Sequence, residues 1–408
     1  MMSNYKGTME TSDRFNILYS HRTRGEDVEG IHIKGMANAF LQLGHHVNYV
    51  AVPGATTNNV EKKLKKNEKN GGGRQSFWTF VSKFCPQLLF ELMELAYNFV
   101  LYANLKKNVQ KKHIDFIYER YALNTFATVW FGKKYNIPVI LEVNDATGIR
   151  RVRRHKAEFL AQRIESWVFR NCDAIVTISS EFKRILCQRG VSEEKVSFLP
   201  NAVDPLVFDP FRYDDKVRSQ LKLKGKTIIG FIGSFAKWHG VDMLLRVMPD
   251  VIKKIPNVYF LMVGSGVCLQ DVKDKIKNSG LIEKVIFTGK VSSEYVPCYL
   301  KAMDIGVIPD SNQYGSPMKL FEYMSMKVVP VVPKLPPILD VIQDEVTGFV
   351  FDRKNVQSLK EQLIHACENK DLRKQIGKNA REQVLEKHLW IHNARSVLNL
   401  YNRIKTFS

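Results

Sequence analysis

The sequence lacks the patterns that mark several common classes of protein. None of its six cysteines forms a Cys-x-x-Cys pair, so we expect neither a zinc site nor a disulfide framework. No apolar run reaches the roughly 18 residues of a membrane-spanning helix, and the first residues, MMSNYKGTMETSD, contain no apolar signal segment. Scattered thiols without such signals favour a cytoplasmic protein.

Motifs of dinucleotide, phosphate and metal chemistry are missing as well. The segment GSGVCLQ has the first two glycines of a dinucleotide fingerprint, but Leu269 takes the place of the third, which disfavours a Rossmann dehydrogenase. There is no Walker lysine motif and no Asp-x-Asp triplet, and the histidines do not have the spacing of metal ligands. We therefore expect neither a metal ion nor a cofactor.

What the chain does have is length and positive charge. Its 408 residues are too many for one ordinary core, so two domains are expected. The formal net charge is +20 and is spread over both halves of the chain. Such a charge favours anionic partners, which include nucleic acid, lipid headgroups and phosphorylated small molecules.

Short apolar runs alternate with helical patterns along the chain. The runs are about five residues long, rich in Val and Ile and continuous, which is typical of parallel strands buried on both faces. Helical patterns such as KGMANAFLQLG and VDMLLRVMPDVIKK complete βαβ units, so the sequence predicts two tandem Rossmann-like, doubly wound α/β domains. The expected strands are FNILYS, VNYVAV, FIYER, VILEVN, AIVTIS and VSFLPN in the first half, and TIIGFIGS, YFLMVG, VIFTG, IGVIP, VVPVV and GFVF in the second.

The domain boundary is predicted at Val203. The segment NAVDPLVFDPFRYDDK follows, in which Asp204, Pro205, Asp209 and Pro210 interrupt regular structure. In a pair of doubly wound domains, a ligand is expected outside the carboxyl ends of the parallel strands.

The stretch YGSPMKLFEYMSMK is the first candidate site. A Gly-Ser-Pro turn opens a helix, and Pro317 suits the first helical turn. The amides of Ser316, Met318 and Lys319, together with the lysine ammonium, would then bind a diphosphate. Glu322 lies about one turn further along, where a carboxylate can accept two sugar hydroxyls. The alternative is an ordinary solvated charge pair on a surface helix.

The stretch GFIGSFAKWHGVDMLL is the second candidate site. A strand ends at Gly233, a loop follows, and a helix begins near Gly240. Loop amides and a helix start form an anion site, to which Lys237 and His239 can add donors. The alternative is a plain strand-to-helix loop with a solvated lysine.

The first half holds weaker signals. Gly30 opens a helix after a polar loop, where a glycine lets the backbone approach a ligand. The strand VILEVN ends in Glu142 and Asn144 and leads into Asp145 and an arginine-rich stretch, which is either a solvated face or an anion site.

Two segments have unusual composition. Residues 61–74 are of low complexity, and we expect a mobile loop. Residues 77–112 are rich in aromatic side chains and end in lysines, while Glu91 and Glu94 exclude a membrane span. That region is either a helix packed on the first domain or an interfacial amphipathic segment.

Taken together, these motifs resemble the family-4 retaining glycosyltransferases of the GT-B fold. The resemblance runs from about Phe15 to Trp390 and rests on GSFAKWHGVDMLL with GSPMKLFEYMSMKVVPVV, on PNAVDPLVF, and on IYERYALNTFATVWFGKKYNIPVILEVN with NCDAIVTISSEFKRIL. It implies two domains facing a central cleft, and metal-independent transfer of a sugar from a nucleoside-diphosphate-sugar to an acceptor, with retention at the anomeric carbon.

The resemblance also implies a role for each part of the chain. Residues 1–203 would bind the acceptor, residues 204–384 would bind the nucleotide-sugar, and residues 385–408 would return to the first domain. Lys319, Lys237 and Asn144 are the predicted catalytic residues. The residues implied in donor binding are Gly30, Gly233, Ser234, His239, Gly264, Lys290, Val291, Ser316, Pro317, Met318, Leu320 and Glu322.

Three positions depart from the family pattern. Tyr314 stands where many members have the first of two glutamates, and Ser234 stands where many have an arginine. Asn144 takes the place of a histidine that often ends its strand. Because the missing glutamate and histidine contact the sugar in many members, these departures leave the sugar unassigned.

Two other functions remain open at this stage. A nucleotide-sugar epimerase has the same architecture but needs no acceptor, which leaves residues 77–112 without a purpose. A nucleic-acid-binding protein would explain the charge, but no aromatic-plus-basic binding module is found, so we expect no nucleic acid partner. For the transferase, charge and aromatic content point to a lipid-linked saccharide as acceptor and to an anionic membrane surface, with peripheral attachment at its cytoplasmic side.

Overall fold

The computed structural model describes residues 14–23, 28–52, 55, 87–149 and 156–407. By their internal contacts these residues form two compact units. The first contains residues up to Thr177, Cys187–Ser197 and Ala394–Ser408, and the second contains Ile178–Leu186 and Phe198–Asn393. The low-complexity segment 61–74, the aromatic residues 77–84 and the arginines at 150, 151, 153 and 154 lie outside the described residues.

The first unit is built on a six-stranded sheet in the order β2-β1-β3-β4-β5-β6. Its pairs β1–β2, β1–β3, β3–β4 and β4–β5 are parallel. Ile17, Leu18 and Tyr19 in β1 are consecutive and fully buried, as expected for a strand covered on both faces. The strands are β1 (Asn16–His21), β2 (His46–Ala51), β3 (Phe116–Arg120), β4 (Val139–Val143), β5 (Ala174–Thr177) and β6 (Val196–Phe198).

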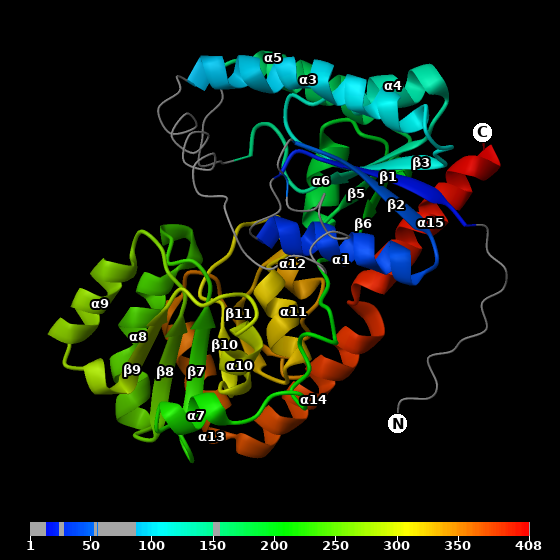
Figure 1. The fold of residues 1–408 in the computed structure, drawn as a ribbon. Coiled ribbons are helices and arrows are strands. Elements are labelled where there is room, and N and C mark those ends of the chain that lie inside the picture. The colour runs from blue at the N-terminus through cyan, green and yellow to red at the C-terminus, as the bar shows by residue number, and fades with distance from the viewer. Residues whose placement is uncertain (1–13, 24–27, 53–54, 56–86, 150–155, 408) are drawn as a thin grey trace, which may run out of the picture. The chain divides into compact units, whose positions relative to one another are not determined.

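Helices connect these strands (Figure 1). Polar side chains of one helix bind the main chain at the starts of two others. The Glu91 carboxylate accepts the N–H groups of Lys156 and Ala157 at 2.8 and 2.9 Å, directly before α5. The Asn98 amide oxygen accepts the N–H groups of Phe126 and Ala127 at 2.8 and 2.9 Å, at the start of α4. The helices are α1 (Val28–Gln42), α3 (Gln87–Val109), α4 (Ala127–Tyr135), α5 (Glu158–Asn171), α6 (Ser180–Gln188) and the 3-10 turn η3 (Glu193–Lys195).

The second unit has a six-stranded sheet in the order β12-β11-β10-β7-β8-β9, with parallel pairing throughout. Alternate residues of β7 enter two different cores: Ile229 and Phe231 face one side, and Ile228 and Ile232 face the other. Both faces are therefore buried, which is why the strands are continuously apolar. The strands are β7 (Thr227–Ile232), β8 (Val258–Val263), β9 (Val285–Gly289), β10 (Ile305–Val307), β11 (Val329–Pro333) and β12 (Phe349–Phe351).

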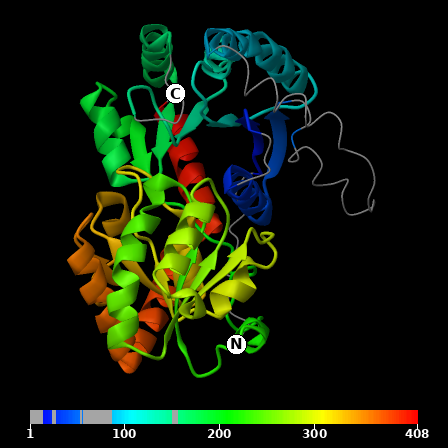
Figure 2. The ribbon, with the colours of Figure 1, turned by 90° about the vertical axis from the view of Figure 1, so that its left-hand side faces the viewer.

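Helices of the second unit cover both faces of this sheet (Figures 1 and 2). In α8 the buried residues Val241, Leu244, Met248 and Val251 recur at helical spacing and form the stripe that packs on the core. The helices are α7 (Lys216–Gln220), α8 (Val241–Lys254), α9 (Leu269–Asn278), α10 (Val296–Lys301), α11 (Met318–Ser325), α12 (Pro336–Leu339), α13 (Val356–Glu368) and α14 (Lys370–Lys387), with the 3-10 turns η4 (Lys237–His239) and η5 (Ile282–Lys284). The last helix, α15 (Trp390–Phe407), begins in the second unit and belongs to the first from Ala394 onward.

Each of the twelve predicted strands coincides with an observed one, and the predicted α/β class with two parallel, doubly wound sheets is confirmed. The sequence predicted that residues 1–203 and 385–408 form one domain and residues 204–384 the other. The observed units divide the chain at more points than that. Ile178–Leu186 belongs to the second unit, where the Ser179 hydroxyl donates to the Tyr314 carbonyl at 2.6 Å. The return to the first unit begins at Ala394 within α15, where Tyr401 stacks on Phe116 at 4.6 Å between ring centroids.

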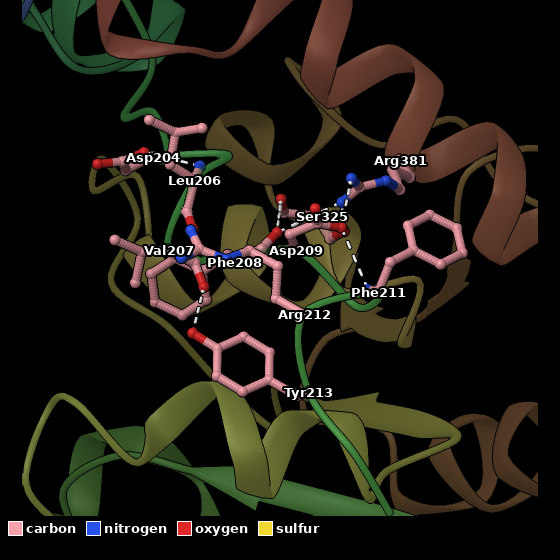
Figure 3. Close-up of polar contacts among 10 residues, drawn as sticks. All are labelled: Asp204, Leu206, Val207, Phe208, Asp209, Phe211, Arg212, Tyr213, Ser325 and Arg381. Carbon is pink, nitrogen blue, oxygen red and sulfur yellow. Dashed lines mark hydrogen bonds and ion pairs between the residues drawn. The ribbon is translucent and has the colours of Figure 1, made fainter. Parts of the chain in front are cut away.

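The segment before α7 is irregular, as its Asp-Pro content predicted, and it is fastened to the second unit (Figure 3). The Arg381 guanidinium, from α14, donates to the Phe208 carbonyl at 3.3 Å and the Asp209 carboxylate at 3.0 Å, and also to the Ser325 carbonyl. The Ser325 hydroxyl donates to the Phe208 carbonyl at 2.6 Å. One partly buried arginine therefore binds a main-chain carbonyl and a carboxylate of a segment that has no ladder of its own, and links them to the end of α11.

Replacing Arg381 with methionine tests this fastening. We expect Arg381→Met to lower the free energy of unfolding by about 2–3 kcal/mol, because buried carbonyls and the Asp209 carboxylate lose their donor. Urea unfolding measures the change. Arg212→Ala is the control, since the exposed Arg212 side chain donates to the Leu206 carbonyl of its own segment; it should cost less than about 0.5 kcal/mol. Equal losses in the two variants would contradict the assignment.

Candidate functional site

The second sheet has its topological switch point between β7 and β10. The chain runs from β7 through β8 to β9 on one side, then crosses over to β10, β11 and β12 on the other. In open parallel sheets, ligands bind outside the carboxyl ends of the strands at such a point. The loops after β7 and β10 carry both motifs that the sequence singled out in this half.

Glycines bring the ends of the central strands into direct contact. A Cβ atom at Gly264 would lie 1.9 Å from the Gly233 carbonyl oxygen, and both residues have positive φ, 133° and 138°. The Gly264 N–H donates to the Gly289 carbonyl at 2.9 Å, which links the end of β8 to that of β9. Only glycine permits this close approach of main chain to main chain. The result is a floor of exposed backbone around the strand ends.

The loops after β7 and β10 meet next to this floor. The Asp310 N–H donates to the His239 carbonyl at 3.2 Å, and a Cβ atom at Gly240 would lie 2.8 Å from the Asp310 Cβ atom. Arg353 holds Asp310 in place with a contact of 2.8 Å to its carboxylate. Sequence reasoning missed Asp310 and Arg353, because they are 43 residues apart and share no local pattern.

The helix α11 starts at Met318, one residue after Pro317. The sequence predicted Pro317 in the first turn of this helix. In the structure it is the cap residue that precedes that turn. Ser316 is fixed by Asn201, whose N–H donates to the serine hydroxyl at 3.0 Å and whose amide donates to the serine carbonyl at 2.6 Å. The first amides of a helix have no partner within it, so the start of α11 presents unpaired donors and the positive end of the helix dipole.

Lys319 is the central feature of this site. Its Nζ atom is buried and has no hydrogen-bond acceptor among the residues that the structure describes. A Cβ atom at Gly233 would lie 2.5 Å from this Nζ, so the glycine is what leaves room for the ammonium. The Nζ also sits 4.6 Å from the ring centroid of Phe231. A buried ammonium that has an aromatic face beside it but no hydrogen-bond acceptor among the described residues is suited to bind an anion.

The surroundings shift three titratable groups. Burial lowers the pKa of Lys319 to about 8, although the Glu322 carboxylate acts in the opposite direction. Burial raises the pKa of Glu322 to about 7, against the effect of Lys319. Burial, assisted by the charge of Lys319, lowers the pKa of His239 to about 3, so its imidazole is neutral at physiological pH. A lysine and a glutamate with strongly shifted pKa values, one turn apart, are typical of a functional site.

The other predicted donor-binding residues of this unit fall into two groups. Ser234, Lys237 and Lys290 are exposed near the strand ends and remain free to reach a ligand in solution. Leu320 is fully buried in the core and its N–H donates to the Pro317 carbonyl, while the Val291 side chain packs against the same core. The side chains of Leu320 and Val291 therefore pack in the core and do not point toward a ligand at the strand ends.

In the first unit, Asn144 belongs to a buried polar cluster around Glu142. The Glu142 carboxylate accepts hydrogen bonds from Tyr118 at 2.9 Å, from Arg120 at 2.6 Å and from the Asn144 amide, and lies 3.5 Å from His32. Burial alone would raise the pKa of Glu142, but His32, Arg120 and the hydrogen bonds together lower it. The carboxylate is therefore ionised and holds Asn144 in place.

This cluster lies at the carboxyl ends of β3 and β4, and Gly30 lies in α1, two residues before His32. Sequence reasoning identified Asn144 and Glu142 but missed Arg120 and His32. The signal for Arg120 was present, because FIYER ends in charged residues beside the neighbouring strand that ends in EVN.

Across the part of the chain that the structure describes, His, Cys, Asp and Glu side chains do not form a group of three or more that could hold a metal ion. Likewise, no described helix is long and apolar enough to cross a membrane.

Two family models match adjacent parts of the chain. Residues 30–205 match Glycosyltransferase Family 4, and residues 213–383 match Glycosyl transferases group 1. A curated relative, an uncharacterized glycosyltransferase of Methanocaldococcus jannaschii, is 24% identical over 247 residues, which are 60% of this chain and 62% of the relative. The alignment thus spans less than two thirds of that relative's length.

Solved structures share the fold over nearly the whole chain. A glycosyltransferase from Rickettsia africae superposes with a TM-score of 0.73 at 17% identity, covering 97% of this chain and all of the other. Anabaena HepE in complex with UDP superposes with a TM-score of 0.69 at 14% identity, covering 95% and 100%. The two family models together cover most of the chain and agree with the fold, so this chain belongs to the glycosyltransferase family with the GT-B fold.

Proposed function

We propose that this glycosyltransferase transfers a sugar from a nucleoside-diphosphate-sugar to an acceptor, with retention at the anomeric carbon and without a metal ion. The observation that carries the proposal is the buried, unpaired ammonium of Lys319 at the switch point of the second sheet. An anion with several oxygens, placed before α11, satisfies that ammonium and the first amides of the helix at once.

The diphosphate of the donor fits this arrangement by size and charge. Gly233 and Gly264 leave the strand ends free of side chains, so phosphate oxygens can approach the main chain closely. The exposed Lys237 and Ser234 follow in the same loop and supply further donors. Glu322, one turn into α11, has a carboxylate suited to accept the hydroxyls of the ribose.

The chemistry follows from where charge develops. As the bond from the sugar to the diphosphate breaks through an oxocarbenium-like state, negative charge grows on the leaving diphosphate. Lys319 and the start of α11 are fixed before the reaction and stabilise that charge without having to reorganise. In this proposal they supply the positive charge that a divalent cation supplies in other transferases.

We assign the acceptor to the first unit and propose a lipid-linked saccharide, made at the cytoplasmic side of a membrane. The support is the net charge of +20, which favours an anionic substrate and surface. The Glu142 cluster at the ends of β3 and β4 positions Asn144 as the polar group offered to the sugar or acceptor.

The donor is the first thing to identify by experiment. Thermal unfolding of the purified protein with UDP, GDP, ADP and CMP identifies the nucleotide, because a ligand that binds only the folded state raises the unfolding temperature. UDP is tested first, since the solved Anabaena structure contains it. The matching nucleotide-sugar is then incubated with and without acceptor lipids. Formation of a new sugar isomer with no acceptor present would instead identify an epimerase.

Replacing Lys319 with alanine tests the charge-stabilising role. We expect Lys319→Ala to lower turnover by about a hundredfold or more, because a preorganised cation at the leaving group is lost. Release of the nucleoside diphosphate, followed in the presence of acceptor, measures the effect. Lys277→Ala on the exposed side of α9 is the control of equal charge and should keep full turnover. Turnover within about threefold of the parent in a folded Lys319→Ala protein would refute the role.

Affinity for the nucleoside diphosphate should depend on pH through the same residue. The pKa of Lys319 is lowered from 10.5 to about 8, so the ammonium present below that pH is lost as the pH rises through it. The bound anion favours the ammonium, so binding takes up a proton above pH 8 and affinity falls. We expect a drop of about fivefold to tenfold between pH 7.5 and 9 by calorimetry. Lys319→Ala should not show this drop, and an equal drop in that variant would place its origin elsewhere.

A further inference from the structure

The helix α3 buries polar side chains and exposes large apolar ones, which is the reverse of an ordinary surface helix. Its polar side chains Glu91 and Asn98 are each only 3% exposed, whereas Phe99, the next residue, is 80% exposed. Surface helices of globular proteins normally bury the apolar stripe and expose the polar one. The inversion therefore needs an explanation.

The buried polar residues have structural partners within the first unit. Glu91 binds the N–H groups before α5 and Asn98 binds those at the start of α4, as described above. Glu94 accepts from Arg22 at 2.6 Å and from Asn124 at 2.9 Å. These contacts hold α3 in one rotation, so its apolar side is committed to face outward.

The outward side of α3 forms a continuous apolar surface, which we call the α3 face. Its members recur at spacings of three, four and seven residues, with the exposed Ala96 between the two groups, so they lie along one side of the helix. Their exposed fractions range from 38% for Met93 to 80% for Phe99. The α3 face consists of Leu88, Leu89, Leu92, Met93, Phe99 and Val100.

The start of α5 extends this surface. Because Glu91 holds Lys156 and Ala157, the first turn of α5 lies beside the amino-terminal half of α3, and both helices are seen together in Figure 1. Phe159 and Leu160, in that turn, are 68% and 45% exposed. The guanidinium of Arg163 lies 4.4 Å from the ring centroid of Phe159. A cation therefore accompanies the apolar side chains here too.

The charges around the α3 face have one dominant sign. Between Gln87 and Lys112, the exposed charged side chains are all lysines, because Glu91 is buried and Glu94 is mostly buried. These lysines are Lys106, Lys107, Lys111 and Lys112. An apolar helix face that ends in a group of cations is the pattern of a helix lying in the interface of an anionic membrane.

We propose that the α3 face docks this protein on an anionic lipid bilayer, with the leucines and Phe99 inserted at the level of the headgroups and the lysines against lipid phosphates. The charges favour a bilayer over a second copy of the chain, since the four exposed lysines at the carboxyl end of α3 outnumber the one exposed carboxylate of this surface, Glu158 at the start of α5. This docking stands independently of the proposed sugar transfer.

Sedimentation with lipid vesicles tests the proposal directly. The full chain is mixed with vesicles of phosphatidylcholine alone or with about a third of phosphatidylglycerol, and the bound fraction is measured. We expect binding to the anionic vesicles, and a loss of about tenfold or more in the double variant Leu92→Glu, Phe99→Glu, because two inserted side chains become charged. Lys106→Ala with Lys107→Ala should weaken binding to anionic vesicles by about tenfold at low salt.

Matched controls separate docking from general hydrophobicity and misfolding. Val267→Glu changes an apolar residue of the second unit that is 92% exposed, and it should bind vesicles like the parent. Circular dichroism and retained nucleotide binding show that each variant is folded. Equal binding of the parent and of the Leu92→Glu, Phe99→Glu variant would overturn the proposal. So would a parent dimer in light scattering that this variant abolishes, because the α3 face would then be a contact between copies.

Discussion

The site depends on one electrostatic constraint, the burial of the Lys319 ammonium without an acceptor. A buried cation costs free energy, which the aromatic ring of Phe231 offsets only in part. The fold tolerates this because Gly233 has no side chain to compete for the space and because α11 and β7 are held by cores on both faces of the sheet. A polyphosphate would relieve this cost, so the burial of the ammonium favours binding of the donor.

The two units place polar groups at the same structural position, the carboxyl ends of parallel strands, but they do so differently. In the second unit, the Lys319 ammonium has no hydrogen-bond acceptor among the described residues. In the first, Glu142 is already surrounded by Arg120, Tyr118 and Asn144. The unpaired lysine of the second unit suits capture of an anion and stabilisation of changing charge. The Glu142 cluster of the first unit suits precise placement of a neutral amide, that of Asn144. In the same unit, α3 uses its polar residues for internal contacts and exposes its apolar side.

Much of this was readable in the sequence. The strands were predictable because burial on both faces makes them continuously apolar, and Lys319 and Glu322 because a Gly-Ser-Pro turn precedes them. Contacts between distant segments were not. Nothing local pairs Asp310 with Arg353, and Leu320 looks like a neighbour of the site until its burial in the core is known. From the sequence, Glu91 and Glu94 showed only that residues 77–112 do not span a membrane. That both carboxylates point inward is known only from their contacts in the structure, before α5 and with Arg22.

The most direct measurement is the titration of Lys319 itself, by NMR of protein labelled at the lysine side chains, with Lys319→Ala assigning the signal. The account predicts a pKa near 8 for the free protein, as burial dictates, and a rise to above about 10 when the nucleoside diphosphate is bound. A pKa that is ordinary in the free protein, or that does not move on binding, would contradict the claim that this ammonium receives the diphosphate.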